Sequence, residues 1–122
     1  MIKLARDVLE DKKAENIVVL DVRKLSSVTD YHLICTGSNP RHFKALIESC
    51  EKSLREKEQK PYRVSGTPES AWMILDYLDF VVHVFGEETR EHYALETLWK
   101  DAPRVKPRTR ALKAAPVAKS AS

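Results

Sequence analysis

The 122-residue chain lacks the long apolar run that a membrane-spanning helix requires. Its longest apolar stretch, Phe80–Phe85, is interrupted by His83. The first residues place an acid at Asp7 and contain no apolar segment of the kind found in a secretory signal peptide. These absences argue against an integral membrane protein and against a secreted one, so we expect a cytoplasmic protein with no membrane partner.

Cysteine is also scarce, because the chain has only two, which is too few for a disulfide framework. Cys35 falls within an apolar run and Cys50 falls on the apolar stripe of a predicted helix, so we expect both to be buried. A redox or nucleophilic role is the less favoured alternative, because no neighbouring residue would lower the pKa of either thiol. This usage fits a reducing compartment.

The motifs that catalysis would need are missing as well. Residues 36–39 form the only candidate for a phosphate-binding loop, and no Lys follows them. Nucleotidyl transfer needs two carboxylates on one strand face, whereas Asp76 and Asp79 flank a predicted turn. The four histidines show no metal-ligand spacing. We therefore expect no enzyme, no catalytic residue, no metal and no cofactor; the alternative is a small nucleotide-dependent nucleotidyltransferase that uses the strand end at Gly37.

The charge that is present is unevenly distributed. Residues 103–122 carry a net charge of +6 without any acid, residues 1–102 carry −3, and residues 69–101 carry −6. The last segment has too few large apolar side chains to repay the entropy lost on ordering. We expect a single α/β domain at 1–102 and a disordered, flexible basic tail at 103–122. The tail would contact RNA phosphates, as an arm or as an RNA-binding module, or serve only to solubilise the chain.

The pattern of apolar residues predicts an α/β fold, a mixed sheet of about five strands with flanking helices. The strand at 17–22 is apolar on both faces, which predicts an inner strand, and its pairing with the next strand is left open. Residues 65–68 read as a turn, and only Leu78-Asp79 separate the last two strands, which indicates an antiparallel hairpin. The predicted helices are 2–14, 40–58 (capped by Asn39) and one from Glu87 with Leu95, Leu98 and Trp99 as its stripe; the predicted strands are 17–22, 31–36, 62–64, 72–77 and 80–85.

Large amphipathic residues mark the hairpin as a candidate binding surface. Trp72 opens its first strand, and Tyr77 and Leu78 stand at the tip, where a Gly, Asn or Asp is expected. Trp and Tyr contribute most to the energy of protein interfaces. The hairpin lies in the acidic third of the chain, which suits a basic protein partner better than a phosphate. For Trp72 the alternative is a core position beside Trp99, and both remain open.

An ordered set of short motifs resembles the ribosomal silencing factor family (RsfS, also called Iojap). No single motif is specific, but their order and spacing are. The match covers most of residues 2–102 and excludes the tail. The motifs are Asp30-Tyr31, Leu33-Ile34-Cys35-Thr36-Gly37, Arg41-His42, Trp72, Leu75-Asp76-Tyr77, Asp79, Val81-Val82-His83-Val84-Phe85, Arg90, Tyr93, Leu95-Glu96 and Leu98-Trp99.

The resemblance implies a nucleotidyltransferase-like fold without the transferase activity. It also implies a translation repressor that binds the large ribosomal subunit through ribosomal protein fourteen and blocks joining of the small subunit. Contact of the tail with ribosomal RNA and a homodimer are further expectations. The family usually has Gly where Leu78 stands, which makes this residue an additional candidate contact. The expected partner-binding residues are Trp72, Leu75, Asp76, Tyr77, Leu78 and Asp79.

Overall fold

The computed structural model describes residues 2–94 and 102–105. Five strands form one mixed sheet in the order β1-β2-β5-β4-β3, in which β2 and β5 are parallel and the other neighbours are antiparallel. The expected α/β fold is confirmed, and the open pairing of the first two strands is antiparallel. The elements are α1 Ile2–Asp11, β1 Glu15–Asp21, β2 Tyr31–Thr36, α2 Pro40–Arg55, β3 Arg63–Thr67, the 3-10 turn η1 Pro68–Ser70, β4 Trp72–Asp76, β5 Phe80–Phe85 and α3 Glu87–Tyr93.

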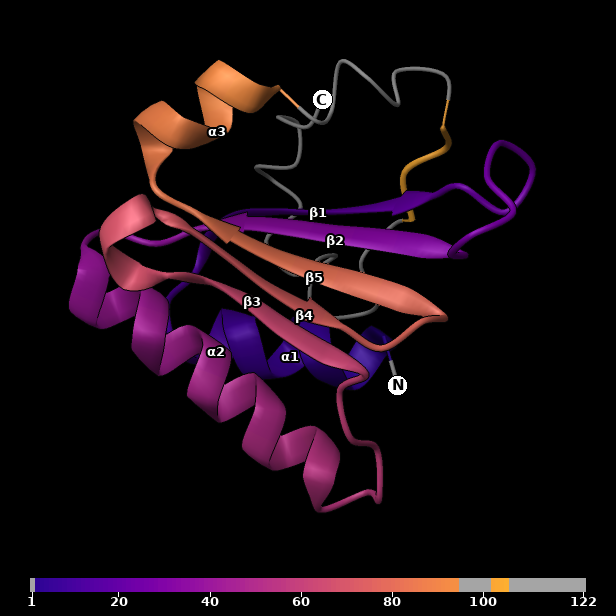
Figure 1. Cartoon of the computed structure of the whole chain (residues 1–122), viewed down its shortest axis with the longest axis horizontal. Coiled ribbons are helices and arrows are strands. Elements are labelled where there is room, and N and C mark those ends of the chain that lie inside the picture. Colours follow the sequence, from indigo (N-terminus) through magenta and orange to yellow (C-terminus); the bar gives the residue numbers. More distant parts are fainter. Residues whose placement is uncertain (1, 95–101, 106–122) are drawn as a thin grey trace, which may run out of the picture.

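The helices divide between the two faces of the sheet. Figure 1 shows α1 and α2 on one side of the sheet and α3 on the other. Successive side chains of a strand point to opposite faces, so alternate residues of β2, β4 and β5 enter the core beneath α1 and α2. Those buried strand residues are Leu33, Cys35, Met73, Leu75, Phe80, Val82 and Val84.

The helix α2 begins as its sequence predicts. The side chain of Asn39 accepts a hydrogen bond from the backbone N–H of His42 (2.9 Å), and Pro40 occupies the first helical position. The helix ends at Arg55, three residues earlier than expected, and the chain then turns through Glu58, whose φ is 63°. Its predicted apolar stripe is buried: Phe43, Leu46, Ile47, Cys50 and Leu54.

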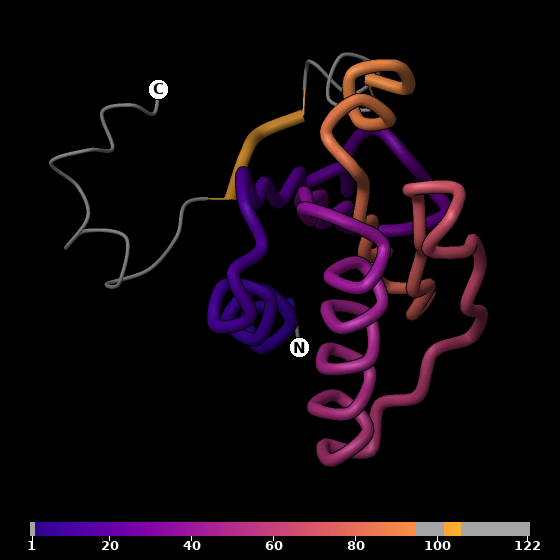
Figure 2. The backbone as a smooth tube through the Cα atoms, turned by 90° about the vertical axis from the view of Figure 1, so that its left-hand side faces the viewer, coloured from indigo at the N-terminus to yellow at the C-terminus, as the bar shows by residue number. Residues whose placement is uncertain are grey.

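The strand β1 lies at an edge of the sheet, so its expected inner position is wrong. Its outer edge instead pairs with residues 103–105: the N–H of Asp21 donates to the carbonyl of Pro103 (2.8 Å) and that of Val105 to Val19 (2.8 Å). Figure 2 shows this segment beside β1. The strand is apolar on both faces because it is covered on both, not because strands flank it. The domain therefore extends to residue 105, beyond the expected boundary at 102, and residues 106–122 lie outside the described part.

Two connections differ from the expected ones. The strand β3 continues through the predicted turn at 65–68 as far as Thr67, and the turn follows at η1. Gly66 permits this course, since its φ is +84° and a Cβ there would lie 2.0 Å from the carbonyl oxygen of Trp72. The strand β4 ends at Asp76, so three residues rather than two connect it to β5. The stripe expected for the last helix at 95–99 lies outside the described residues.

Candidate partner-binding surface

The structure distributes the six expected contact residues over three places. Trp72 and Asp76 point away from α1 and α2 and are half-buried. Leu75 and Tyr77 point into the core on the α2 side, where they are 0% and 7% exposed. Leu78 and Asp79 are exposed at the turn. The expected surface position of the Leu75 and Tyr77 side chains is wrong, because strand alternation sends them to the opposite face from Trp72.

Tyr77 shows how fully that inner face is sealed. Its ring stacks on Phe80 with 4.9 Å between the centroids, and burial raises the pKa of its hydroxyl. The side chain therefore supports the hairpin from beneath, and a partner cannot contact it in this conformation.

We call the opposite side the Trp72 face. Cross-strand pairing places Ile74 opposite His83, and Asp76 opposite Val81. Ile74 and Val81 are half-buried, and Tyr93 is 49% exposed. Sequence reasoning missed these three residues, although the alternation of β4 and β5 would have identified the two aliphatic ones. The Trp72 face comprises Trp72, Ile74, Asp76, Val81 and Tyr93.

The indole of Trp72 is both packed and accessible. Its ring lies 5.0 Å from the ring of Phe85, which is fully buried, and 4.4 Å from the ring of Tyr93. The packing agrees in part with the core alternative for this residue, and its role in an interface stays a prediction. Trp99, its expected core neighbour, lies outside the described residues. Such an anchored aromatic loses little side-chain entropy when a partner binds to it.

The polar edge of the indole is bonded inside the protein. The Nε1–H of Trp72 donates to Nδ1 of His83 (3.2 Å), and Nε2 of His83 lies 3.0 Å from Nδ1 of His32. Burial, assisted by His32, lowers the pKa of His83 to about 3. Burial also lowers the pKa of His32, against the opposing charge of Asp76. Because its N–H is used internally, Trp72 offers a partner its carbon surface.

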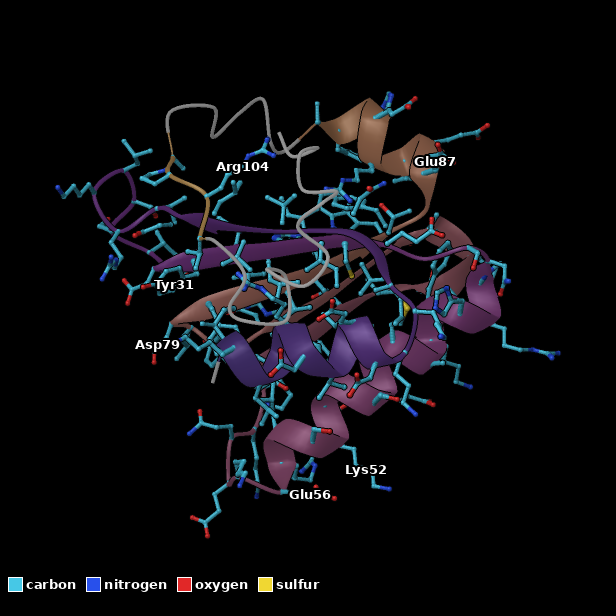
Figure 3. All side chains as sticks on the ribbon, turned by 180° about the vertical axis from the view of Figure 1, so that it is seen from behind. Tyr31, Lys52, Glu56, Asp79, Glu87 and Arg104 are labelled. Carbon is cyan, nitrogen blue, oxygen red and sulfur yellow. The ribbon has the colours of Figure 1, made fainter. Side chains whose placement is uncertain are left out.

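Acidic side chains flank both ends of the Trp72 face. The N–H of Gly86 donates to the carbonyl of Ala71 (2.9 Å), which places the exposed Glu87 and Glu88 of α3 beside the start of β4. Asp79 stands at the far end of the hairpin, and Figure 3 shows it and Glu87 at opposite ends of the sheet. A surface of this kind, apolar in the middle and acidic at its ends, complements a basic protein.

Two basic side chains of the described residues lie near these acids. Arg90 of α3 is turned inward, where it donates to the carbonyl of Asn16 and to the hydroxyl of Thr36, both at 2.7 Å. Arg63 stands opposite Asp76 in the pairing of β3 with β4 and is exposed. Glu87 and Glu88 are exposed to solvent, while the guanidinium of Arg90 is bonded to Asn16 and Thr36.

The turn between β4 and β5 adds an exposed apolar side chain. Leu78 is 53% exposed and adopts a φ of 72°, and its N–H donates to the carboxylate of Asp76 (2.8 Å). The carbonyl of Asp79 accepts hydrogen bonds from the N–H groups of Asp30 (2.9 Å) and Tyr31 (3.3 Å). The turn is thus joined to the β1–β2 connection and held at this end of the sheet.

The other sequence candidates have structural explanations. Burial raises the pKa of both Cys35 and Cys50 to about 12, so neither thiol is activated as a nucleophile. At the strand end, the N–H of Ser38 donates to Nδ1 of His42 (2.9 Å). A Cβ at Gly37 would lie 2.7 Å from the ring of Phe43, so close packing explains this glycine.

The described residues lack two kinds of feature. In that part of the chain, no three or more His, Cys, Asp or Glu side chains gather where they could hold a metal ion. Within the same residues, no helix has the length and apolar character needed to cross a membrane.

Comparison with known proteins gives consistent matches. The model of the family described as "Ribosomal silencing factor during starvation" matches residues 1–122. The ribosomal silencing factor of Bacillus subtilis is 37% identical over 103 residues, which cover 84% of this chain and 87% of that protein. The mouse "Mitochondrial assembly of ribosomal large subunit protein 1" is 32% identical over 94 residues, 75% of this chain and 41% of that protein. A crystal structure of a Chromobacterium violaceum protein superimposes with a TM-score of 0.78 at 35% identity, covering 81% of this chain and 82% of that one.

Proposed function

The chain belongs to the ribosomal silencing factor family, and from this premise we propose that it represses translation at the large ribosomal subunit. In this proposal it binds ribosomal protein fourteen and thereby blocks attachment of the small subunit. The mouse relative is named for assembly of the large subunit, which supports the choice of subunit. We place this activity in the cytoplasm.

The observation that carries the proposal is the composition of the Trp72 face. A half-buried indole, packed on Phe85 and Tyr93, lies beside Ile74 on a face whose ends are acidic. Aromatic anchors of this kind act as hot spots, and acidic residues around them guide a basic partner to the surface. Ribosomal proteins that contact RNA are rich in basic side chains, so this chemistry suits one of them.

The proposed mechanism is steric and requires no chemical step. A bound domain prevents two large bodies from meeting if it occupies part of the surface through which they join. The protein then needs only an affinity that keeps it bound at cellular concentration and a rigid fold. The buried core beneath α1 and α2 supplies that rigidity.

The test compares two variants of the Trp72 face with a matched control. We expect Trp72→Glu to lower the affinity for purified large subunits and for isolated ribosomal protein fourteen by at least about 100-fold, since an anchor is lost and a charge is desolvated. Ile74→Glu places the same charge on the face and keeps the indole. Ala45→Glu places it on the exposed side of α2, remote from the Trp72 face, and should bind normally. Affinity is measured by sedimentation with labelled chain.

Circular dichroism and thermal unfolding show whether each variant is folded. If Ile74→Glu remains folded and binds the large subunit as tightly as the wild-type chain, the Trp72 face is not the binding surface.

Two smaller parts of the proposal concern the C-terminal residues and self-association. We propose that the basic residues 106–122 contact ribosomal RNA, which a chain ending at Val105 would test, because it keeps the pairing with β1. Loss of phosphate contacts should flatten the dependence of binding on salt. The homodimer expected from the family stays a prediction, which analytical ultracentrifugation of the free chain would test.

A further inference from the structure

Three side chains on one face of the sheet form a continuous hydrogen-bonded chain. It runs from the indole of Trp72 on β4, through His83 on β5, to His32 on β2, with contacts of 3.2 and 3.0 Å. His83 is only 6% exposed, and His32 is half-buried. A buried imidazole and a half-buried one that are hydrogen-bonded in line with a half-buried tryptophan call for an explanation.

The direction of this chain follows from its first member. An indole N–H can only donate, so Nδ1 of His83 must accept and carries no proton. The proton of neutral His83 is then on Nε2, which donates to Nδ1 of His32. His32 accepts at Nδ1 and, when neutral, carries its own proton on Nε2. Each ring has one possible tautomer, and every hydrogen bond points away from Trp72.

Neither histidine can take up a proton while both hydrogen bonds are kept. If His32 gains a proton on Nδ1, two N–H donors face each other across the contact with His83. If His83 responds by moving its proton to Nδ1, that proton faces the Nε1–H of Trp72. One of the two bonds breaks in either case, and in the second arrangement it is the hydrogen bond that orients the indole.

We propose that His83 and His32 are positioning residues, which hold the indole of Trp72 in its partner-binding orientation only while both imidazoles are neutral. This inference rests on the proposed function of the Trp72 face. It adds that the affinity for the large subunit falls in mild acid, through residues that need not touch the partner.

Burial and neighbouring charges set the pH at which the affinity for the large subunit falls. Asp76 favours the protonated form of His32, and burial outweighs it, so the pKa of His32 is lowered. Burial and the nearby His32 both lower the pKa of His83. At neutral pH both hydrogen bonds are therefore intact, and protonation of the two imidazoles begins below the usual pKa of histidine. The charged or titratable groups on the elements around the pair are Asp76 on β4, Arg63 on β3, Arg90 and Tyr93 on α3, and Arg104 bridged to β1.

The first experiment examines the free full-length chain by nitrogen NMR of its histidine rings and indoles. At pH 7.5, His83 should be protonated on Nε2 and His32 on Nε2, and the Nε1–H signal of Trp72 should shift together with their titration. A His83 ring protonated on Nδ1 at pH 7.5 would overturn the inference without reference to any partner.

The second experiment measures binding to purified large subunits between pH 7.5 and pH 5.5. His83→Asn retains an acceptor for the indole and removes the titrating ring, and His83→Phe retains a ring and removes the acceptor. His42→Gln removes a histidine on α2 as the control. We expect wild-type and His42→Gln affinity to fall between pH 7.5 and pH 5.5 by up to about tenfold, a limit set by the pKa of His32, which lies below the ordinary histidine value. His83→Asn should bind with little dependence on pH, and His83→Phe weakly throughout.

The outcomes separate the two proposals. A folded wild-type chain that binds large subunits at no pH contradicts the proposed function, while the NMR result still decides the chain of hydrogen bonds. If wild type binds and His83→Asn has the same pH profile, the positioning role is wrong and the proposed function stands. Partner groups that titrate in this range affect all variants alike, so the inference depends only on the difference between profiles.

Discussion

The two faces of the same sheet have opposite chemistry. On β4, Met73 and Leu75 point beneath α2 and are 8% and 0% exposed, whereas Trp72, Ile74 and Asp76 alternate with them and are half-buried. The first face is apolar and closed by two helices (Figure 1). The second carries an indole, two histidines and carboxylates. One strand thus supplies both core residues and residues of the proposed binding surface, and these alternate along β4.

Neighbouring substitutions on β4 give the sharpest test of this contrast. Leu75→Ala leaves a cavity in the closed face and should lower the free energy of unfolding by about 3 kcal/mol. Ile74→Ala removes a similar side chain from the half-open face and should cost about 1 kcal/mol or less. Urea unfolding of both variants measures the difference. Equal losses would show that the Trp72 face is as much a part of the core as its opposite.

Acid should destabilise the fold through the face that carries the histidines. The pKa of His83 is about 3 when folded, below the ordinary 6.5, so the unfolded chain binds more protons between these values. Stability is therefore complete above pH 6.5 and falls as the pH decreases. Between pH 7 and pH 5 the loss should be about 2 kcal/mol from this residue. Urea titrations at several pH values measure it, and His83→Asn should reduce the slope; an unchanged slope would exclude His83 as its source.

The smallest expected change in stability concerns the turn that joins β4 to β5. Leu78 has a φ of 72°, which costs a non-glycine residue about 1 kcal/mol, so Leu78→Gly should raise the free energy of unfolding by up to that amount. Leu25 is similarly exposed and has no positive φ, so Leu25→Gly is the control and should be slightly destabilising. If both variants lose stability equally, the turn at Leu78 is not strained.

Local patterns predicted the elements well. The cap at Asn39, the stripe of α2 and the exact span Phe80–Phe85 each depend on residues close in sequence, which explains why they were correct. The pairing of residues 103–105 with β1 joins segments more than eighty residues apart, and no local signal marks it.

The candidate site was predicted in part, for a related reason. Successive residues of a strand point to opposite faces, so the contiguous motif Leu75-Asp76-Tyr77 contributes side chains to both. The residues expected from the family resemblance therefore combined core positions with positions on the Trp72 face. Alternation alone would have grouped Ile74 with Trp72. The contact of Trp72 with Tyr93 and its hydrogen bond to His83 depend on pairing and on the course of α3, which the sequence does not reveal.

The most direct test of the proposed function is a subunit-joining assay with purified large and small ribosomal subunits. The full-length chain is added to the large subunits at saturating concentration, and joined ribosomes are measured by sucrose-gradient sedimentation. We predict that the wild-type chain keeps the subunits apart and travels with the large subunit, while Ile74→Glu permits joining. Full joining in the presence of bound wild-type chain would contradict the steric mechanism.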